Sequence, residues 1–379
     1  MLKILCIGTC SDIKRNRFTG QSIMFDGVVN YLKEHDNKVS VVDISQKINK
    51  GGVLCRSLDY SVILIELLWR LITNKFDLCY ITSSQSKKGF IRDNAMITIC
   101  RWFKVPVITH QYGANYHQLL DALGESGIKM LKKMLGYVST IIVEGDYMKE
   151  QFSFLPDYQL KVMPIPNGLP IEGIHSQVPK TYDGNRPFVM FYLSNLIWSK
   201  GFFDVLQAVD LLVNREHLDV KCVFAGKFMA SHDDERSGIA NKGDFDKFVK
   251  EHSLTKRIEY FPGLYGDEKD KYFYESNVFL LPTYYINEGQ PVSIIEAMAY
   301  GCVPLVTEYR HIPMMINEQN GCFVKPKNAE DITKKIKYLI EHPDIYATKS
   351  KQCITDYQQK FMFDVYAEKV MNCINAVIS

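Results

Sequence analysis

Short apolar segments rich in Val and Ile alternate with amphipathic segments of helical length along all 379 residues of the chain. This alternation is typical of parallel sheets that are covered by helices. The pattern predicts six strands in each half. In the first half we expect them at residues 2–8, 38–44, 78–82, 105–110, 139–144 and 160–165, and in the second half at residues 188–194, 220–226, 257–261, 277–283, 303–308 and 321–326.

One Pro- and Gly-rich segment without apolar periodicity, residues 166–187, interrupts the alternation and predicts a linker. We therefore expect an α/β chain with two doubly wound, Rossmann-like domains that face each other across a cleft. Ligands of such sheets bind at the carboxyl ends of the strands, so the chemistry is expected in that cleft. The expected parts are an N-terminal domain at 1–170, a linker at 171–186, a C-terminal domain at 187–355, and a C-terminal helix at 356–379 that packs back on the N-terminal domain.

Composition narrows the class of protein. Hydrophobic residues make up 46% and charged residues 23%, which is ordinary for a folded, globular chain. Residues 1–170 carry 21 basic and 15 acidic residues, whereas the remainder carries 24 and 28. A basic first half can face an anionic membrane or a phosphorylated ligand, or be an ordinary solvated surface. Basic runs interleaved with aromatic residues are missing from the sequence, which argues against nucleic acid, and ten cysteines without CxxC spacing fit a reducing cytosol.

The apolar segments of the sequence are too short to cross a bilayer, which takes about 18 to 20 residues. The apolar N-terminus is also too short for a signal peptide and is expected to be the first strand. Residues 60–76 include Glu66 and Arg70 and predict an amphipathic helix. We expect its apolar face to lie in the core, with contact to a membrane surface as the alternative.

Two carboxylates lie eight residues apart in the segment NEGQPVSIIE, residues 287–296. An apolar strand precedes this segment, and the residues from Pro291 to Tyr300 have helical character with Pro at the first helical position. Free amides at the start of such a helix suit a phosphate. Glu288 lies just before these amides and Glu296 about one turn inside the helix. We therefore expect the pair to bracket an anion site, the alternative being two ordinary surface charges.

The segment NEGQPVSIIEAMAYGCVPLVT, residues 287–307, resembles the Glu-x7-Glu motif of the retaining glycosyltransferases of family four, which have the GT-B fold. The similarity continues in FYLSNLIWSKGFFDVLQAV (191–209), VFAGK (223–227) and PIPNGL (164–169). In the first half, FTGQSIMFDGVVNYL (18–32) resembles the family's Gly loop and THQYGANY (109–116) its His-containing segment, with less specific matches.

The resemblance implies a role for each matching residue. Glu288 is implied to contact the donor sugar and to stabilise positive charge on the face opposite the leaving group. Lys200 is implied to neutralise charge on the departing nucleotide, and His110 to contact an outer hydroxyl of the sugar, although a lone His is more often structural. The residues implied to bind the donor are Gly20, Asn195, Gly263, Leu264, Gly289, Gln290, Val292, Ser293 and Glu296.

Within this donor set, the resemblance assigns the diphosphate to the amides of Val292 and Ser293, the ribose to Glu296 and the base to backbone groups near Gly263. The sequence departs from the family at Asn195, where an Arg is usual. Asn carries no charge, so neutralisation is expected to depend more on Lys200, on the helix N-terminus, on the Gly20 loop, or on another cation such as Lys227. Arg92 and Asp93 are interpreted as scaffold.

Scattered His residues and the lack of an Asp-x-Asp sequence give no sign of a metal site. The resemblance implies that lysine and helix dipoles act in place of a metal, so we expect no metal and no cofactor beyond the co-substrate. The expected function is transfer of a sugar from a nucleotide-diphosphate sugar, with UDP favoured over GDP, to a glycan acceptor. The acceptor is expected to be lipid-linked, in surface polysaccharide biosynthesis at the cytoplasmic face of the inner membrane.

Three alternatives remain open from the sequence. Asn195 in place of Arg also fits a non-catalytic subunit that binds a nucleotide sugar and assists a partner. A sugar-nucleotide epimerase with the same fold would act without any acceptor. A dinucleotide oxidoreductase is poorly supported, because no GxGxxG follows the first expected strand. The sequence does not specify the base, the sugar, the acceptor or the linkage.

Overall fold

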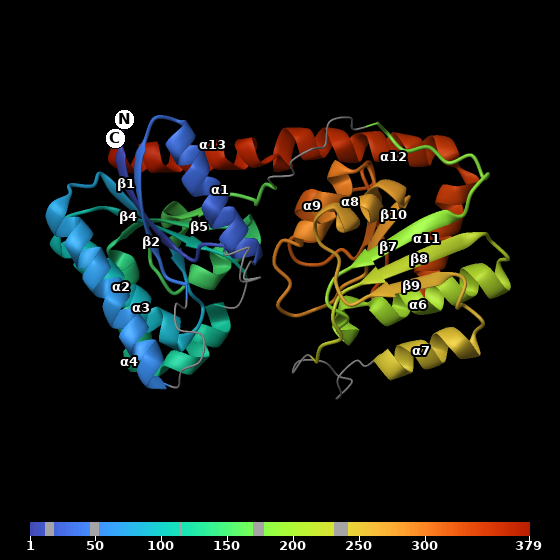
Figure 1. Ribbon diagram of the computed structural model, residues 1–379, viewed down its shortest axis with the longest axis horizontal. Coiled ribbons are helices and arrows are strands. Elements are labelled where there is room, and N and C mark those ends of the chain that lie inside the picture. The colour runs from blue at the N-terminus through green and yellow to red at the C-terminus, as the bar shows by residue number, and fades with distance from the viewer. Residues whose placement is uncertain (12–18, 46–52, 114–115, 170–177, 231–241) are drawn as a thin grey trace. The chain divides into compact units, whose positions relative to one another are not determined.

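A computed structural model describes residues 1–11, 19–45, 53–113, 116–169, 178–230 and 242–379, with the backbone alone at 53–58. The chain divides into two compact units (Figure 1). The N-terminal unit comprises Met1–Pro170 and Phe363–Ser379, and the C-terminal unit comprises Ile171–Met362. Of the expected linker, residues 171–177 lie outside the described residues. The expected boundary between residues 355 and 356 falls inside helix α12 (Pro343–Asp356). This helix belongs wholly to the C-terminal unit.

The N-terminal unit is built on a parallel sheet in the order β2-β1-β3-β4-β5-β6. Its strands are β1 (Lys3–Gly8), β2 (Lys38–Asp43), β3 (Leu78–Ser83), β4 (Val107–Gln111), β5 (Val138–Val143) and β6 (Val162–Pro164). Its helices are α1 (Gly20–Glu34), α2 (Val53–Thr73), α3 (Lys87–Trp102), α4 (Tyr116–Gly136), α5 (Tyr158–Lys161) and α13 (Phe363–Ile378).

Both faces of this sheet are buried, which explains the continuous apolar runs of the sequence. Side chains alternate along a strand, so Leu5 and Ile7 of β1 enter one core while Ile4 and Cys6 enter the other. The first core is covered by α2, α3 and α4, and the second by α1 and α13 (Figure 1). A Cβ at Gly27 of α1 would lie 2.5 Å from the ring of Phe363, so glycine lets these two helices approach closely.

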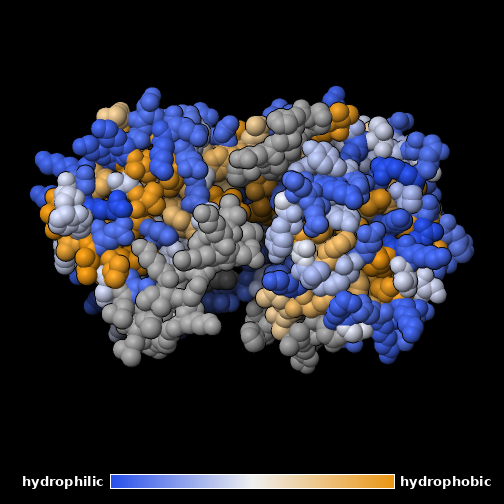
Figure 2. Space-filling view, viewed as in Figure 1, coloured by the Kyte–Doolittle hydropathy of each residue, from blue (hydrophilic) through white to orange (hydrophobic). Residues whose placement is uncertain are grey.

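Helix α2 is apolar on two sides, which differs from the expectation that its apolar face lies in the core. Ile63, Leu67 and Leu71 are buried, as expected. Val62, Ile65, Trp69 and Ile72, spaced three or four residues apart, are instead 52% to 67% exposed. Figure 2 shows hydrophobic side chains gathered over this helix at the left of the view. We call these four residues the α2 stripe.

The C-terminal unit contains a second parallel sheet, in the order β12-β11-β10-β7-β8-β9. Its strands are β7 (Phe188–Leu193), β8 (Val220–Ala225), β9 (Ile258–Phe261), β10 (Val278–Leu281), β11 (Val303–Val306) and β12 (Cys322–Phe323). Its helices are α6 (Phe202–Asp210), α7 (Lys242–Glu251), α8 (Gly266–Glu275), α9 (Val292–Ala299), α10 (Ile312–Met315), α11 (Ala329–Glu341) and α12.

The structure confirms the α/β fold class and a strand at each of the twelve predicted positions. Two details differ from the prediction. Strand β12 has only two residues, because the amide of Lys325 bonds to Asp331 at 2.8 Å instead of continuing the ladder. Helix α9 begins at Val292, and Pro291 precedes it as N-cap with a ψ of 106°, because an extended residue is needed where the chain turns from the loop into the helix.

Candidate active site

The most distinctive polar residues of the C-terminal unit gather where its strand order reverses. Strand β7 pairs with β8 on one side and with β10 on the other, so β7 and β10 flank the topological switch point. In open α/β sheets, ligands bind outside the carboxyl ends of the strands at such a switch point. Lys200 follows β7 in a short 3-10 helix, Trp198–Lys200, and Glu288 follows β10.

Lys200 and Glu288 form an ion pair that is largely buried. The Lys200 Nζ lies 2.7 Å from Oε1 and 2.8 Å from Oε2 of Glu288, whose residue is only 5% exposed. Thr283 Oγ1 donates a hydrogen bond of 2.7 Å to Oε2 of the same carboxylate. The ring of Tyr285 lies 5.1 Å from the ammonium. Removing both charges from water is costly, and direct pairing with added hydrogen bonds offsets that cost.

Close packing holds the β7 and β10 loops together. The amide of Tyr284 donates to the carbonyl of Ser199 at 2.7 Å. Gly201 has a φ of +75°, and a Cβ at this position would lie 2.5 Å from the carbonyl oxygen of Pro282. Only glycine tolerates both conditions. The SKG sequence therefore serves two purposes, since its lysine reaches Glu288 and its glycine permits the approach of the loops.

The start of α9 lies directly after the Glu288 loop. Its first-turn amides include those of Val292 and Ser293, and the first amides of a helix have no acceptor within the helix. Val292, Ser293 and Glu296 are half-buried on one side of α9, whereas Ile294 and Ile295 are fully buried. This pattern agrees with the expectation that Glu296 lies on the same side as the first amides.

Glu296 has a partner that the sequence did not indicate. Lys269 of α8 lies with its Nζ 2.5 Å from Oε1 of Glu296. Burial raises the pKa of the Glu296 carboxyl, and the neighbouring Lys269 ammonium opposes that rise. The remaining loop candidates, Gly289 and Gln290, lie between Glu288 and α9, and Gln290 is 5% exposed.

The other predicted donor residues of this unit follow β7 and β9. Asn195 comes after β7 and is exposed. Gly263 and Leu264 come after β9, with the side chain of Leu264 buried. Since the strands are parallel, all these loops leave the same edge of the sheet. The structure thus gathers the predicted residues of the C-terminal unit along one edge, with Lys200 and Glu288 in direct contact.

Gly20 and His110 belong to the N-terminal unit. Gly20 is the first residue of α1, behind a capping box of Thr19 and Ser22, and among the described residues no atom lies within 4 Å of the position that a Cβ would take. His110 in β4 is fully buried, and its Nδ1 lies 2.7 Å from the Tyr80 hydroxyl. Burial lowers the pKa of His110 to about 3, so the ring is neutral. In this conformation His110 has no surface with which to contact a sugar.

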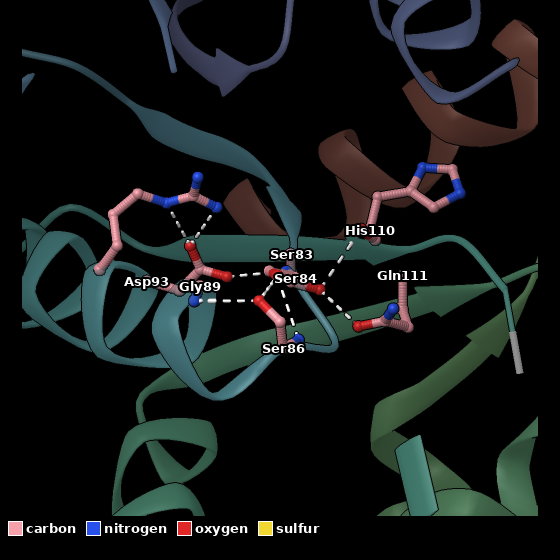
Figure 3. A network of polar contacts seen from close by, with 8 residues as sticks. Ser83, Ser84, Ser86, Gly89, Asp93, His110 and Gln111 are labelled. Atoms are coloured by element: carbon pink, nitrogen blue, oxygen red, sulfur yellow. Dashed lines mark hydrogen bonds and ion pairs between the residues drawn. The ribbon is translucent and has the colours of Figure 1, made fainter. Parts of the chain in front are cut away.

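A polar network follows β3 and β4 in the same unit (Figure 3). Asp93 accepts hydrogen bonds from the Ser84 amide at 2.7 Å and from Arg92 at 2.7 and 2.9 Å, and it is only 2% exposed. Figure 3 shows the side chains of His110 and Gln111 leaving β4 on opposite sides. Ser84 and Asp93 therefore fix the start of α3, which agrees with the interpretation of Arg92 and Asp93 as scaffold.

Two further properties bear on the class of protein. Among the described residues, His, Cys, Asp and Glu side chains form no group of three or more that is placed to hold a metal ion. In the described part of the chain, no helix combines the length and the apolar character needed to cross a membrane.

Comparison with known proteins identifies the C-terminal half. Residues 177–360 match the family described as glycosyl transferases group 1. The matched segment, slightly less than half of the chain, is similar to that family. The matched segment contains Lys200, Glu288 and Glu296, so the ion pair at the switch point lies inside the group 1 glycosyl transferase region.

Individual relatives extend the likeness. The chain is 21% identical over 253 residues to Bacillus subtilis TuaC, named for glycosyl transfer in teichuronic acid biosynthesis, with 64% of this chain and 57% of TuaC covered. It is 30% identical over 103 residues, 27% of each protein, to the Campylobacter jejuni N,N'-diacetylbacillosaminyl-diphospho-undecaprenol alpha-1,3-N-acetylgalactosaminyltransferase. The matches thus cover less than two thirds of either curated relative.

A solved structure supports the fold of the whole chain. Anabaena Alr3699/HepE, crystallised with UDP and glucose, matches with a TM-score of 0.69 and 14% identity over 99% of this chain and all of that one. At this identity the likeness establishes the fold and nothing more. The GT-B resemblance read from the sequence is therefore confirmed for the architecture.

Proposed function

We propose that this group 1 glycosyl transferase moves a sugar from a nucleotide-diphosphate sugar to a glycan acceptor with retention of the anomeric configuration. The observation that carries the proposal is the Lys200–Glu288 pair beside the start of α9, at the switch point of the sheet. An ammonium and free helix amides suit a diphosphate, and a carboxylate held by Thr283 suits sugar hydroxyls. The ammonium, the helix amides and the carboxylate all lie in the C-terminal unit, in the segments that follow β7 and β10.

In the proposed reaction the bond between the anomeric carbon and the phosphate oxygen breaks, and the acceptor hydroxyl oxygen bonds to that carbon from the same face. The acceptor proton passes to the departing phosphate oxygen, and the nucleoside diphosphate leaves. Lys200 and the amides of Val292 and Ser293 stabilise the charge on the leaving group. Glu288 stabilises the developing positive charge on the sugar, and Glu296 accepts hydrogen bonds from the ribose. In this scheme the cationic and amide groups perform the work of a metal ion.

Under this proposal the Lys200–Glu288 contact balances both charges whenever no donor is bound. A buried ammonium or carboxylate without a partner is strongly destabilising. Each group therefore neutralises the other until a donor arrives, when the diphosphate offers Lys200 a second anionic partner. Gly20, Gly263, Leu264, Gly289 and Gln290 remain proposed donor contacts, and Asn195 is proposed to donate a single hydrogen bond.

A lipid-linked acceptor at the cytoplasmic face of a membrane is the second part of the proposal. Its support is the exposed α2 stripe, the excess of basic residues in the first half, and the diphospho-undecaprenol in the name of the Campylobacter relative. The nine described cysteines are free thiols, which fits a reducing compartment. UDP is proposed as the nucleotide in preference to GDP.

Thermal unfolding of the purified chain with UDP-, GDP- and ADP-sugars tests the donor class. A ligand that binds only the folded state at 100 times its Kd stabilises it by about 2.7 kcal/mol, so a true donor raises Tm measurably. We expect a rise with UDP-sugars that disappears in Lys200→Met. The proposal fails if none of the three classes raises Tm. Conversion of a UDP-sugar to its epimer without acceptor would identify an epimerase instead.

Asn195 also favours a second candidate, a non-catalytic subunit that binds the nucleotide sugar for a partner. The two candidates differ in chemistry, because a catalytic chain slowly hydrolyses its donor when no acceptor is present. Donor hydrolysis that is lost in Glu288→Ala eliminates the non-catalytic candidate. Restoring the cation with Asn195→Arg separates them further, since it accelerates hydrolysis only if the remaining machinery is catalytic.

A further inference from the structure

A hollow in the C-terminal unit has no role in the proposed reaction. It lies at the carboxyl ends of β10, β11 and β12 and has a volume of about 410 Å³. Thr283 and Thr307 line it, and both are buried. Glu288, Lys200 and α9 do not line it, although the Thr283 hydroxyl bonds to Glu288. The volume lies within the range of small-molecule sites, about 300 to 1,000 Å³.

The walls combine aromatic rings with polar groups of both kinds. Tyr284, Tyr309 and Phe323 supply rings. The Thr283 hydroxyl donates to Glu288 and the Thr307 hydroxyl to the Thr283 carbonyl, so both oxygens can still accept a hydrogen bond from a ligand hydroxyl. A pyranose has the matching chemistry, since its ring presents an apolar C–H face and its hydroxyls also donate and accept.

The charges around the hollow favour an anion. Lys325 and Lys335 line it together with Asp331 and Glu308. Asp331 lies in the first turn of α11 and accepts the Lys325 amide, so backbone dipoles already offset its charge. Glu308 is exposed to solvent. Within the described residues, neither lysine forms an ion pair, although Asp331 lies one turn before Lys335 on α11.

We propose that this hollow binds a pyranose unit that carries one negative charge, either a carboxylate or a phosphate. Lys335 is half-buried and supplies a charge-assisted hydrogen bond to the anion, with Lys325 as its second cation. The rings of Tyr284 and Tyr309 contact the sugar. The expectation that the ligand is a saccharide rests on the proposed function, whereas the anionic character rests on the two lysines alone.

Isothermal titration calorimetry of the full chain tests the proposal. The ligands are glucuronate, glucose 6-phosphate, glucose and inorganic phosphate. At least one charged sugar is expected to bind at least tenfold more tightly than both glucose and inorganic phosphate. Binding of glucuronate alone assigns a carboxylate, and binding of glucose 6-phosphate alone assigns a phosphate. If neither binds, or if inorganic phosphate binds as tightly as the sugars, the proposal is overturned.

Variants then locate the binding site. Lys335→Met is expected to weaken binding of the charged sugar at least tenfold, and Lys335→Gln to do the same if the first variant fails to fold. Lys334→Met is the matched control, because Lys334 is the exposed neighbour on α11 and does not line the hollow. Equal effects of Lys335→Met and Lys334→Met would overturn the proposal. The Tm rise with UDP-sugars, measured on the same samples, reports separately on the donor site and is expected to stay unchanged.

Discussion

The ammonium of Lys200 lies within 2.8 Å of both carboxylate oxygens of Glu288, across 88 positions of sequence. Pairing of β7 with β10 brings the two loops together, and Gly201 allows the approach. Both side chains are largely buried, so each charge depends on the other for its stability. Several consequences can be measured.

Replacing one partner of this pair should destabilise the protein more than replacing both. Lys200→Met leaves the Glu288 carboxylate buried without its cation and is expected to lower the free energy of unfolding by about 3 to 5 kcal/mol. Lys200→Met combined with Glu288→Gln is expected to recover part of that loss. Urea unfolding of wild type, both single variants and the double variant measures the coupling. Additive effects would show that the two side chains do not interact.

Glu296→Gln is expected to stabilise the protein at pH 7 and to weaken binding of the donor. Because burial raises the pKa of Glu296 above its ordinary value, the ionised carboxylate is disfavoured in the folded state. This penalty is absent below the unfolded pKa and grows as pH rises through the folded pKa, so a neutral amide removes it at pH 7. Urea unfolding and UDP-sugar titration measure the two effects, with Glu275→Gln on exposed α8 surface as control. A less stable Glu296→Gln protein would contradict this prediction.

His110 should make stability depend on pH. Its folded pKa of about 3 lies below the ordinary value of about 6.5, so between these values the unfolded chain binds a proton that the folded chain does not. The free energy of unfolding therefore falls as pH falls from 6.5 toward 3. His110→Gln is expected to make this slope shallower, by up to about 1.4 kcal/mol per pH unit. Unfolding at pH 7, 6 and 5 gives the slopes, and identical slopes would contradict the buried, neutral ring.

The α2 stripe should bind an anionic lipid surface. Burying a large apolar side chain in the lipid contributes about 1.5 to 3 kcal/mol to binding. Two polar replacements should therefore lower the affinity for the vesicle by much more than a factor of ten. Ile65→Ser with Trp69→Ser is expected to lower binding to phosphatidylglycerol vesicles at least tenfold in a flotation assay. Leu160→Ser is the control, because Leu160 is 91% exposed outside the stripe. If wild type does not float with the vesicles, the stripe has another partner.

Much of the fold could be predicted from the sequence, because buried parallel strands leave continuous apolar runs that are visible without any tertiary information. Contacts between distant segments leave no such trace. Lys269 beside Glu296 and Thr283 beside Glu288 depend on the packing of α8 against α9 and on the shape of one loop. His110 shows the converse, since its motif suggested a ligand contact while three tyrosines and the core enclose it. The sequence also left open which apolar side chains of α2 are exposed, because apolar residues occur on both sides of that helix.

Release of UDP from UDP-sugars by the purified chain without acceptor tests the central claim most directly, with the released sugar followed by proton NMR. Wild type is expected to release UDP slowly and to give first the anomer of the donor, and Glu288→Gln and Lys200→Met are each expected to be at least tenfold slower. An unchanged rate in both variants, or no release from any UDP-, GDP- or ADP-sugar, would contradict the account.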